Sequence, residues 1–420
     1  MTTLPSGVRV VSERLPGVRS VALGYWIANG SAAERDEQAG LSHLVEHMLF
    51  RGTDRFASVE IDQIFDAMGA EVNAGTDKET TSLFSRVLDH HVEHAFDVMS
   101  DMVWRPTFGG LDAEREVVLE EIAMYEDDPQ ELVFDVLGEA IFGAHPLGRP
   151  IIGRAAVVGA VTREELLAFH GARYRPERVV VAAAGSIDHE ELVALVERHG
   201  PSVEGAPAAP VGGDRNGIPQ EERRVRFVRK DTEQYHVCLG GPGIPRDDER
   251  RFALRVLDNI LGGTSSSRLF QEVREERGLA YAIYSFTSHF ARAGEIGLYL
   301  GTRGENLGEA LGVIAGQLER VREDPASVAE LDRSRENLKG RMALALESTQ
   351  ARMNRLGTSV LADLPILSVD EIIERIDAVG HEDLLALAGE LLDPARLSVA
   401  GIGPDEELLR AALAPVGGGA

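Results

Sequence analysis

The hydrophobic pattern of the first 200 residues changes period repeatedly between that of strands and that of helices. Residues 8–11 and 18–28 alternate or run apolar between glycines, which predicts two strands that lead into a helix near residue 43. Further strands are predicted within 69–76, 80–88 and 178–184, and helices over 58–68, 90–102, 111–125 and 132–142. Thr162 and Glu165 form a capping-box pattern, which predicts one more helix start.

Residues 40–50, Gly-Leu-Ser-His-Leu-Val-Glu-His-Met-Leu-Phe, predict the helix to which the other candidate residues relate. His43 and His47 are four residues apart, so on a helix their imidazoles lie one turn apart and can bind one metal ion. Glu46 lies on the same side, and the apolar residues of the segment point the other way. This H-x-x-E-H pattern supplies two imidazoles for zinc and a carboxylate that can move a proton.

Two histidines need a third protein ligand, and the helix predicted over 111–125 offers several carboxylates. Glu114 and Glu121 are seven residues apart, so they share one face of that helix. We predict Glu121 as the ligand and Glu114 as a carboxylate that orients groups around the metal. Spacing alone does not decide between Glu121 and its neighbour Glu120.

The order of predicted elements recurs after residue 220, which predicts two related halves. Residues 43–53 match 254–264 in pattern, and residues 161–185 match 379–403. Leu111-Asp112 likewise matches Leu331-Asp332. Apolar positions persist in the second half, but the residues that correspond to His43, Glu46, His47 and Glu121 are Leu254, Leu257, Asp258 and Arg341. A fold that forms without these polar residues in one half does not need them for stability in the other, which points to function.

A second match to the motif occurs at His90-His-Val-Glu-His94. In the repeat, His90 and His94 correspond to Glu305 and Glu309, while the apolar residues Val92, Phe96 and Met99 of the same helix remain apolar. We therefore interpret His90, Glu93 and His94 as a solvated helix face. The alternative, a metal-binding scaffold at this cluster, predicts that His90→Ala loses metal.

Several motifs together resemble the pitrilysin, insulin-degrading and mitochondrial-processing-peptidase family of zinc metallopeptidases. Besides the H-x-x-E-H helix and the pair Glu114 and Glu121, they include Phe50-Arg-Gly-Thr53, Val72-Asn73-Ala74, His145-Pro-Leu-Gly-Arg-Pro150 and Gly278-Leu-Ala-Tyr281. The resemblance covers essentially the whole chain, and its length is that of the small two-domain members. It implies an α+β fold of two homologous halves, each with helices on a largely antiparallel sheet, that close as a clamshell.

The resemblance also assigns roles by position. It implies that His43, His47 and Glu121 bind one Zn²⁺ per chain, that Glu46 is the general base, and that Glu114 is a supporting catalytic carboxylate. Asn73 and Ala74 are expected on an edge strand where a peptide substrate pairs with the backbone. Arg274 and Tyr281 match the substrate-binding Arg/Tyr pair of the family. From the residues alone, Arg274 would be a surface charge and Tyr281 a core aromatic residue of a strand.

Residues 201–219 are rich in proline, glycine and alanine, which indicates a linker. We therefore predict a catalytic zinc-binding half at 1–205, a linker at 206–220, and a substrate-binding half without metal ligands at 221–420. Because one chain carries both the metal motif and the Arg/Tyr pair, we expect a homodimer of competent subunits.

Composition limits the class of protein and the cellular compartment that we expect. The chain of 420 residues is 44% hydrophobic and 27% charged, and its net charge of −26 argues against nucleic-acid binding. The single cysteine, Cys238, excludes an internal disulfide framework and a thiolate zinc site. Neither a membrane span nor a signal peptide is recognisable, so we expect no membrane association and a cytoplasmic location.

These observations predict a zinc endopeptidase or oligopeptidase that cleaves peptides or unfolded segments. The alternative from another class is a non-catalytic structural or assembly subunit with the same fold. Such subunits lack motif residues, whereas this chain retains His43, Glu46, His47, Glu114 and Glu121.

Overall fold

The computed structural model describes residues 1–201 and 223–417, which form two compact units. Unit 1 contains residues 1–123, 149–201 and 343–366, and unit 2 contains residues 124–148, 223–342 and 367–417. Each unit thus includes a segment from the other half of the sequence, an exchange that the contiguous predicted halves did not include. The predicted linker, 206–220, lies outside the described residues.

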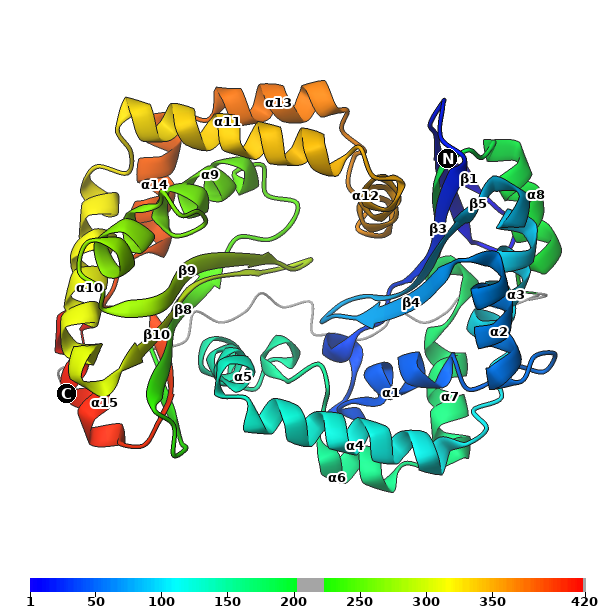
Figure 1. The fold of residues 1–420 in the computed structure, drawn as a ribbon, viewed down its shortest axis with the longest axis horizontal. Helices are drawn as coiled ribbons and strands as arrows, with labels where there is room; N and C mark the ends of the chain where they lie inside the picture. Colours follow the sequence, from blue (N-terminus) through cyan, green and yellow to red (C-terminus); the bar gives the residue numbers. More distant parts are fainter. Residues whose placement is uncertain (202–222, 418–420) are drawn as a thin grey trace. The chain divides into compact units, whose positions relative to one another are not determined.

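Unit 1 is built on a six-stranded sheet with the order β1-β2-β6-β3-β5-β4 (Figure 1). Neighbouring strands are antiparallel except for β2 and β6, which are parallel. Every residue of β6 is buried, because helices cover both faces of the sheet at this strand. The strands are β1 (Thr2–Thr3), β2 (Arg9–Arg14), β3 (Ser20–Ile27), β4 (Glu71–Thr76), β5 (Thr81–Leu88) and β6 (Val179–Gly185).

The larger core of unit 1 lies between this sheet and the helices that come from the first half of the sequence. Alternate residues of β3, such as Leu23 and Tyr25, point into this core, as period-2 geometry requires. Its helices are α1 (Leu41–Met48), α2 (Ser58–Met68), α3 (Val92–Trp104), α4 (Leu111–Asp127), α6 (Ala155–Ala160), α7 (Arg163–Arg173) and α8 (His189–His199).

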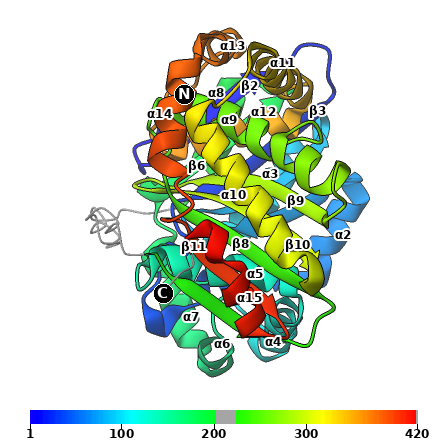
Figure 2. The ribbon, with the colours of Figure 1, turned by 90° about the vertical axis from the view of Figure 1, so that its left-hand side faces the viewer.

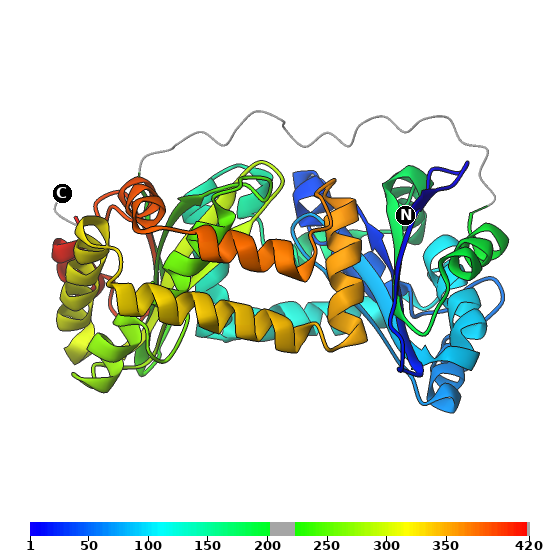
Figure 3. The same ribbon diagram turned by 90° about the horizontal axis from the view of Figure 1, so that it is seen from above.

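The opposite face of the same sheet is covered by α12 (Thr349–Leu361), a helix from the second half of the sequence (Figure 3). Met353, Leu356 and Val360 of α12 pack against Trp26 of β3 and Val180 of β6. Gly357 is required there, since a Cβ would come within 2.3 Å of the Trp26 ring. Arg352 and Arg355 also pair with Glu13 of β2. Unit 1 therefore depends on a helix that lies more than 300 residues along the chain from β3.

Unit 2 repeats this plan with a five-stranded sheet of order β7-β11-β8-β10-β9, which corresponds to β2-β6-β3-β5-β4 (Figure 2). Only β7 and β11 are parallel. The helix α5 (Pro129–Phe142), from the first half of the sequence, packs on β8 and β11. The strands are β7 (Val225–Arg229), β8 (Gln234–Gly243), β9 (Ala280–His289), β10 (Gly294–Arg303) and β11 (Ser398–Gly403).

The other face of the unit 2 sheet carries the core of this unit, in which Val237, Leu239 and Leu300 pack against helices. A π-helical segment, Phe270–Glu275, precedes β9. The helices of unit 2 are α9 (Arg251–Leu261), α10 (Leu307–Glu323), α11 (Val328–Ala345), α13 (Val369–Ala378), α14 (His381–Leu391) and α15 (Glu406–Ala412).

One pair of arginines confirms the repeat at the level of single contacts. Arg115 of α4 bonds to the Asp112 carboxylate and donates to the Val161 carbonyl at 2.6 Å. Arg335 of α11 contacts Asp332 and donates to the Val379 carbonyl. These partners correspond in the repeat predicted from the sequence. The α+β class and the two related units, each with a largely antiparallel sheet, are confirmed.

Candidate metal centre

The helix α1 presents its motif because one face is held in the core of unit 1. Leu44, Val45 and Met48 are fully buried, whereas His43 and His47 retain 12% and 22% of their side-chain exposure. Gly40 begins the helix with φ 102°, and a Cβ there would meet the Ile152 carbonyl at 2.8 Å. The helix thus follows a tight turn that brings the histidines to its accessible side.

Glu34, which the sequence analysis did not identify, caps the start of α1. Its buried carboxylate accepts hydrogen bonds from the Gly40 N–H at 2.9 Å and the Ser42 N–H at 2.6 Å. A carboxylate at this end of a helix satisfies free N–H groups and matches the helix dipole. Burial nevertheless raises the pKa of Glu34 to about 7. Because Glu34 lies six residues before the cap position, the usual spacing signal for a capping residue is missing.

Three side chains converge beside α1. The Nε2 atoms of His43 and His47 lie 3.7 Å and 3.4 Å from Oε2 of Glu121 on α4. Bonds of about 2.0–2.2 Å to a tetrahedral zinc ion would place ligand atoms about 3.3–3.6 Å apart, so the spacing fits that ion. Among the described residues, this is the one group of three or more histidine, cysteine or acidic side chains whose ligand atoms approach closely enough to hold a metal.

The protonation of His43 also suits a ligand. Burial, with a smaller contribution from the nearby His47, lowers the pKa of His43 to about 4. The ring is therefore neutral at pH 7 and keeps a lone pair for a metal. Its Nδ1 atom is buried and has no hydrogen-bond partner among the described residues, so no hydrogen bond at this nitrogen orients the ring.

Glu46 lies between the histidines in sequence and next to them in space. One of its carboxylate oxygens is buried without a hydrogen-bond partner in the part of the chain that the structure describes. Burial, assisted by the charge of Glu121, raises the pKa of Glu46 above its ordinary value, while the hydroxyl of Thr76 opposes the shift. A carboxylate with a raised pKa and an open acceptor oxygen is suited to take and return a proton.

Glu114 does not join the metal group but contacts it through His47. The Nδ1–H of His47 donates to Oε1 of Glu114 at 2.8 Å, and the Glu114 side chain retains only 4% of its exposure. A carboxylate in this position fixes the ring so that Nε2 faces the other ligands. Glu120 is exposed and lies on another face of α4, so the structure brings Glu121 into the group and leaves Glu120 outside it.

The predicted edge-strand residues lie on β4. Asn73 pairs with Phe84 and Ala74 with Leu83 of β5, and β4 is the last strand of its sheet. Its outer edge has no strand partner in the described part of the chain. Thr76, two residues further along the strand, approaches Glu46, so this edge runs up to the metal group.

Arg274 and Tyr281 are brought together in unit 2. The Arg274 guanidinium lies 4.8 Å from the centre of the Tyr281 ring and 4.7 Å from that of Phe270. Tyr281 is 77% exposed at the start of β9, so it is not the core aromatic residue that its strand position alone suggested. Arg274 lies in the π-helical segment, whose wider turn the sequence pattern did not predict.

The second motif match, at 90–94, does not form a comparable group. The rings of His90 and His91 have centres 4.1 Å apart with their planes tilted by 45°, and the carboxylate of Glu93 contacts Arg198. These residues are absent from the metal group found within the described residues. The geometry agrees with a solvated helix face.

Comparison with family models matches residues 9–155 to "Insulinase (Peptidase family M16)" and residues 160–338 to "Peptidase M16 inactive domain". The second match contains none of the metal group. Proteins named as uncharacterized zinc proteases are similar over nearly the whole chain. One from Streptomyces coelicolor is 42% identical over 96% of this chain and 89% of its own length, and YmxG from Bacillus subtilis is 40% identical over 93% and 94%.

Solved structures share the fold. A protease from Helicobacter pylori aligns with a TM-score of 0.90 and 21% identity, covering 96% of this chain and 98% of that one. A peptidase M16 inactive domain from Pseudomonas fluorescens aligns with a TM-score of 0.88 and 23% identity, covering 96% of this chain and 97% of that one.

No helix among the described residues is both long and apolar enough to span a membrane.

Proposed function

This chain belongs to the M16 family of peptidases, and we propose that it is a zinc-dependent endopeptidase or oligopeptidase that cleaves peptides or unfolded segments. The observation that carries the proposal is the convergence of His43, His47 and Glu121 beside the buried carboxylate of Glu46. Two imidazoles and one carboxylate form a ligand set that leaves a position open for water, as catalytic zinc sites do.

The residues divide the chemistry among them. Zinc, when bound by His43, His47 and Glu121, would supply a Lewis acid that polarises the scissile carbonyl and lowers the pKa of water. Glu46 would accept the proton of the attacking water and give it to the leaving amine as the peptide C–N bond breaks. Glu114 would hold the His47 ring through its Nδ1–H. The carboxylate of Glu46 thus takes up and releases the same proton, and no second proton carrier is needed.

Substrate binding is proposed at two places. The free edge of β4 near Asn73 and Ala74 offers backbone groups to an extended peptide, which fits peptides or unfolded segments better than folded proteins. Arg274 and the exposed Tyr281 offer a cation and an aromatic surface from unit 2. Because every element resides in one chain, we propose a homodimer of identical competent subunits.

The alternative, a non-catalytic assembly subunit, has less support. The family model described as an inactive domain covers residues 160–338, a stretch without any of the metal group. The stretch with the metal group matches the peptidase model instead. A subunit that had lost activity would have no need of a buried carboxylate with an unpartnered oxygen beside two histidines.

The experiment compares wild type, Glu46→Gln and Glu120→Gln for zinc content by mass spectrometry and for cleavage of a quenched-fluorescent peptide mixture. We expect one zinc per chain in all three, and a loss of kcat/KM in Glu46→Gln alone by roughly 10²–10⁴-fold. Glu120 is the matched control, an exposed carboxylate beside a ligand. Zinc without cleavage in wild type would favour the assembly subunit, and wild type without zinc would refute the proposal.

A further inference from the structure

Arg51 lies close to the metal group although it is neither a ligand nor a proton carrier. It follows His47 by four residues, and the chain continues the turn of α1 through bonds from Phe50 N to His47 O at 3.2 Å and from Arg51 N to Met48 O at 3.1 Å. Arg51 therefore projects on the same side as His47. Its guanidinium contacts the second carboxylate oxygen of Glu114.

The Glu114 carboxylate is thus held at both oxygens. Oε1 accepts the Nδ1–H of His47, and Oε2 contacts Nη2 of Arg51. The Glu114 side chain is nearly inaccessible, whereas Arg51 is 42% exposed. A countercharge stabilises a buried carboxylate, and a carboxylate bonded at both oxygens cannot rotate about its last bond without losing one of these contacts.

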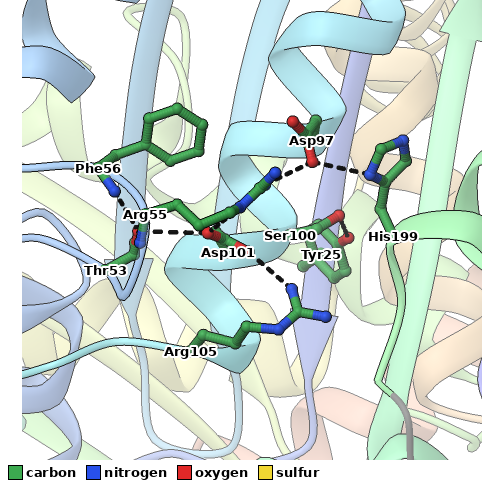
Figure 4. Close-up of polar contacts among 9 residues, drawn as sticks. All are labelled: Tyr25, Thr53, Arg55, Phe56, Asp97, Ser100, Asp101, Arg105 and His199. Carbon is green, nitrogen blue, oxygen red and sulfur yellow. Dashed lines mark hydrogen bonds and ion pairs between the residues drawn. The ribbon is translucent and has the colours of Figure 1, made fainter.

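The loop that carries Arg51 is itself fixed to α3. The carboxylate of Asp101, which is fully buried, accepts from Arg55 Nε at 2.7 Å and from the Thr53 hydroxyl at 3.3 Å, as Figure 4 shows. Arg105 holds the other oxygen of Asp101 at 2.6 Å. This network keeps the segment from 51 to 56 in one place, so Arg51 approaches Glu114 from a rigid support.

The same loop is joined to the chain that enters α4. The Gly52 carbonyl accepts hydrogen bonds from the N–H of Thr107 at 3.1 Å and from its hydroxyl at 3.3 Å. Gly52 has φ 106°, a conformation that suits glycine. Arg51 and Glu114 are therefore attached to segments that are bonded to each other, which fixes the distance between them.

The related half of the chain lacks all three members of this contact chain. At the positions of His47, Arg51 and Glu114, the repeat has Asp258, Gly262 and Ser334. A Cβ at Gly262 would lie 2.3 Å from the Ser285 nitrogen, so no side chain fits there. The three residues are thus present together beside the metal group and replaced together where that group is missing.

We propose that Arg51 is a positioning residue of the metal centre: it fixes Glu114 so that Glu114 holds His47 with Nε2 toward Glu121. The inference rests on the proposed zinc function and adds to it the residue that keeps one ligand oriented. The ion pair that the described structure gives Arg51 is with Glu114 and not with any of the three ligands, so its effect is expected on metal affinity rather than on the presence of the ligands. Outer partners of this kind typically change metal affinity 10–100-fold, so an effect of about that size is expected.

The test measures the zinc dissociation constant by competition with a chromophoric chelator in wild type, Arg51→Met, Arg51→Lys and Arg86→Met. Arg86 is the matched control, an exposed arginine on β5 of the same unit that forms no ion pair with another described residue. We expect Arg51→Met to bind zinc about 10–100-fold more weakly, Arg51→Lys to recover part of the loss, and Arg86→Met to equal wild type. The absorption spectrum of Co²⁺-loaded protein should change in Arg51→Met and return toward wild type in Arg51→Lys.

Thermal unfolding of the metal-free variants separates positioning from folding. Equal melting temperatures with unequal zinc affinity support the proposal. Unchanged zinc affinity in Arg51→Met, or a loss that merely follows a lower melting temperature in both Arg51 variants, overturns it while leaving the zinc function intact. Wild type that binds no zinc overturns both.

Discussion

The helix pair α1 and α4 of unit 1 and the pair α9 and α11 of unit 2 share a scaffold but differ in chemistry. In both units an arginine of the second helix donates to the carbonyl of a corresponding valine, Val161 or Val379. On this shared scaffold, unit 1 carries two imidazoles and three carboxylates where its two helices face each other. They belong to His43, His47, Glu46, Glu114 and Glu121. Unit 2 has Leu254 and Leu257 in the corresponding positions of its first helix, both fully buried.

The difference shows that the polar residues of unit 1 lower the stability of its fold. Within the described residues, His43 has a buried nitrogen and Glu46 a buried oxygen without a hydrogen-bond partner, whereas the leucines at these positions in unit 2 carry no polar side-chain atom. Unpartnered buried polar atoms destabilise a fold by roughly 1–3 kcal/mol each. Unit 1 therefore retains groups that its fold disfavours, as expected where binding or catalysis requires them.

The largest effect on zinc binding and activity is expected when His43 of unit 1 is replaced by leucine, the residue at the corresponding position 254 of unit 2. His43→Leu should abolish zinc binding and reduce kcat/KM by at least about 10³-fold, because the ligand set is broken. The metal-free variant should melt no lower than wild type, since an unpartnered nitrogen is removed. Mass spectrometry of bound metal, peptide cleavage and calorimetry measure these three quantities.

The opposite result, a loss of stability without a loss of zinc, is expected at Leu254, the matching position of unit 2. This position serves as the control. Leu254→Ala should destabilise the protein by about 2–5 kcal/mol, because Leu254 is fully buried, and should leave one zinc per chain. If His43→Leu kept its zinc, or melted several degrees lower in the metal-free state, the contrast between a functional and a structural position would be wrong.

A smaller effect on stability, of equal size in both units, is expected from the two corresponding arginines, Arg115 of unit 1 and Arg335 of unit 2. Arg115→Met and Arg335→Met each remove a charged donor from a backbone carbonyl, and both side chains are largely buried, at 15% and 21% exposure. Each should lower the free energy of unfolding by about 1–3 kcal/mol in denaturant titration. A loss confined to one of the two variants would contradict their equivalence.

The smallest effect concerns pH and sharpens the comparison at α7 and α14, where buried His170 of unit 1 corresponds to Ala388 of unit 2. Burial lowers the pKa of His170 to about 4 in the folded protein, below its unfolded value of about 6.5. The unfolded state then binds more protons between these values, so His170 costs no stability above pH 6.5 and destabilises the fold progressively as pH falls toward 4.

The variant His170→Gln can keep a donor toward the Val103 carbonyl, which His170 Nε2 contacts at 2.9 Å. It should lose about 1–2 kcal/mol less than wild type when the pH is lowered from 7 to 5. Denaturant unfolding at both pH values provides the comparison. Identical acid sensitivity in the two proteins would show that His170 does not titrate as described.

The sequence predicted elements well where one local pattern decides them. The helix expected over 58–68 is Ser58–Met68, and Thr162 forms the capping box with Glu165 that its spacing indicated. The exchange of α5 and α12 could not be predicted, because an amphipathic pattern reveals an apolar face but not which sheet will cover it. The π-helical segment around Arg274 likewise leaves no periodic signal in six residues.

The same limit applies to the site. The motif and the seven-residue spacing led to His43, His47, Glu114 and Glu121, which the structure brings close together. Glu34 and Arg51 were missed because their partners depend on tertiary contacts, six residues away for Glu34 and more than sixty for Arg51. Two local signals could have drawn attention to Arg51: its four-residue step from His47, and its place in the motif Phe50-Arg-Gly-Thr53, to which no role was assigned.

The most direct test of the contrast between the units is anomalous diffraction at the zinc edge from crystals of the zinc-loaded protein. The account predicts one peak per chain, between His43, His47 and Glu121, and none beside Leu254, Asp258 and Arg341. A peak at the second position, a peak at residues 90–94, or no peak in unit 1 would contradict it.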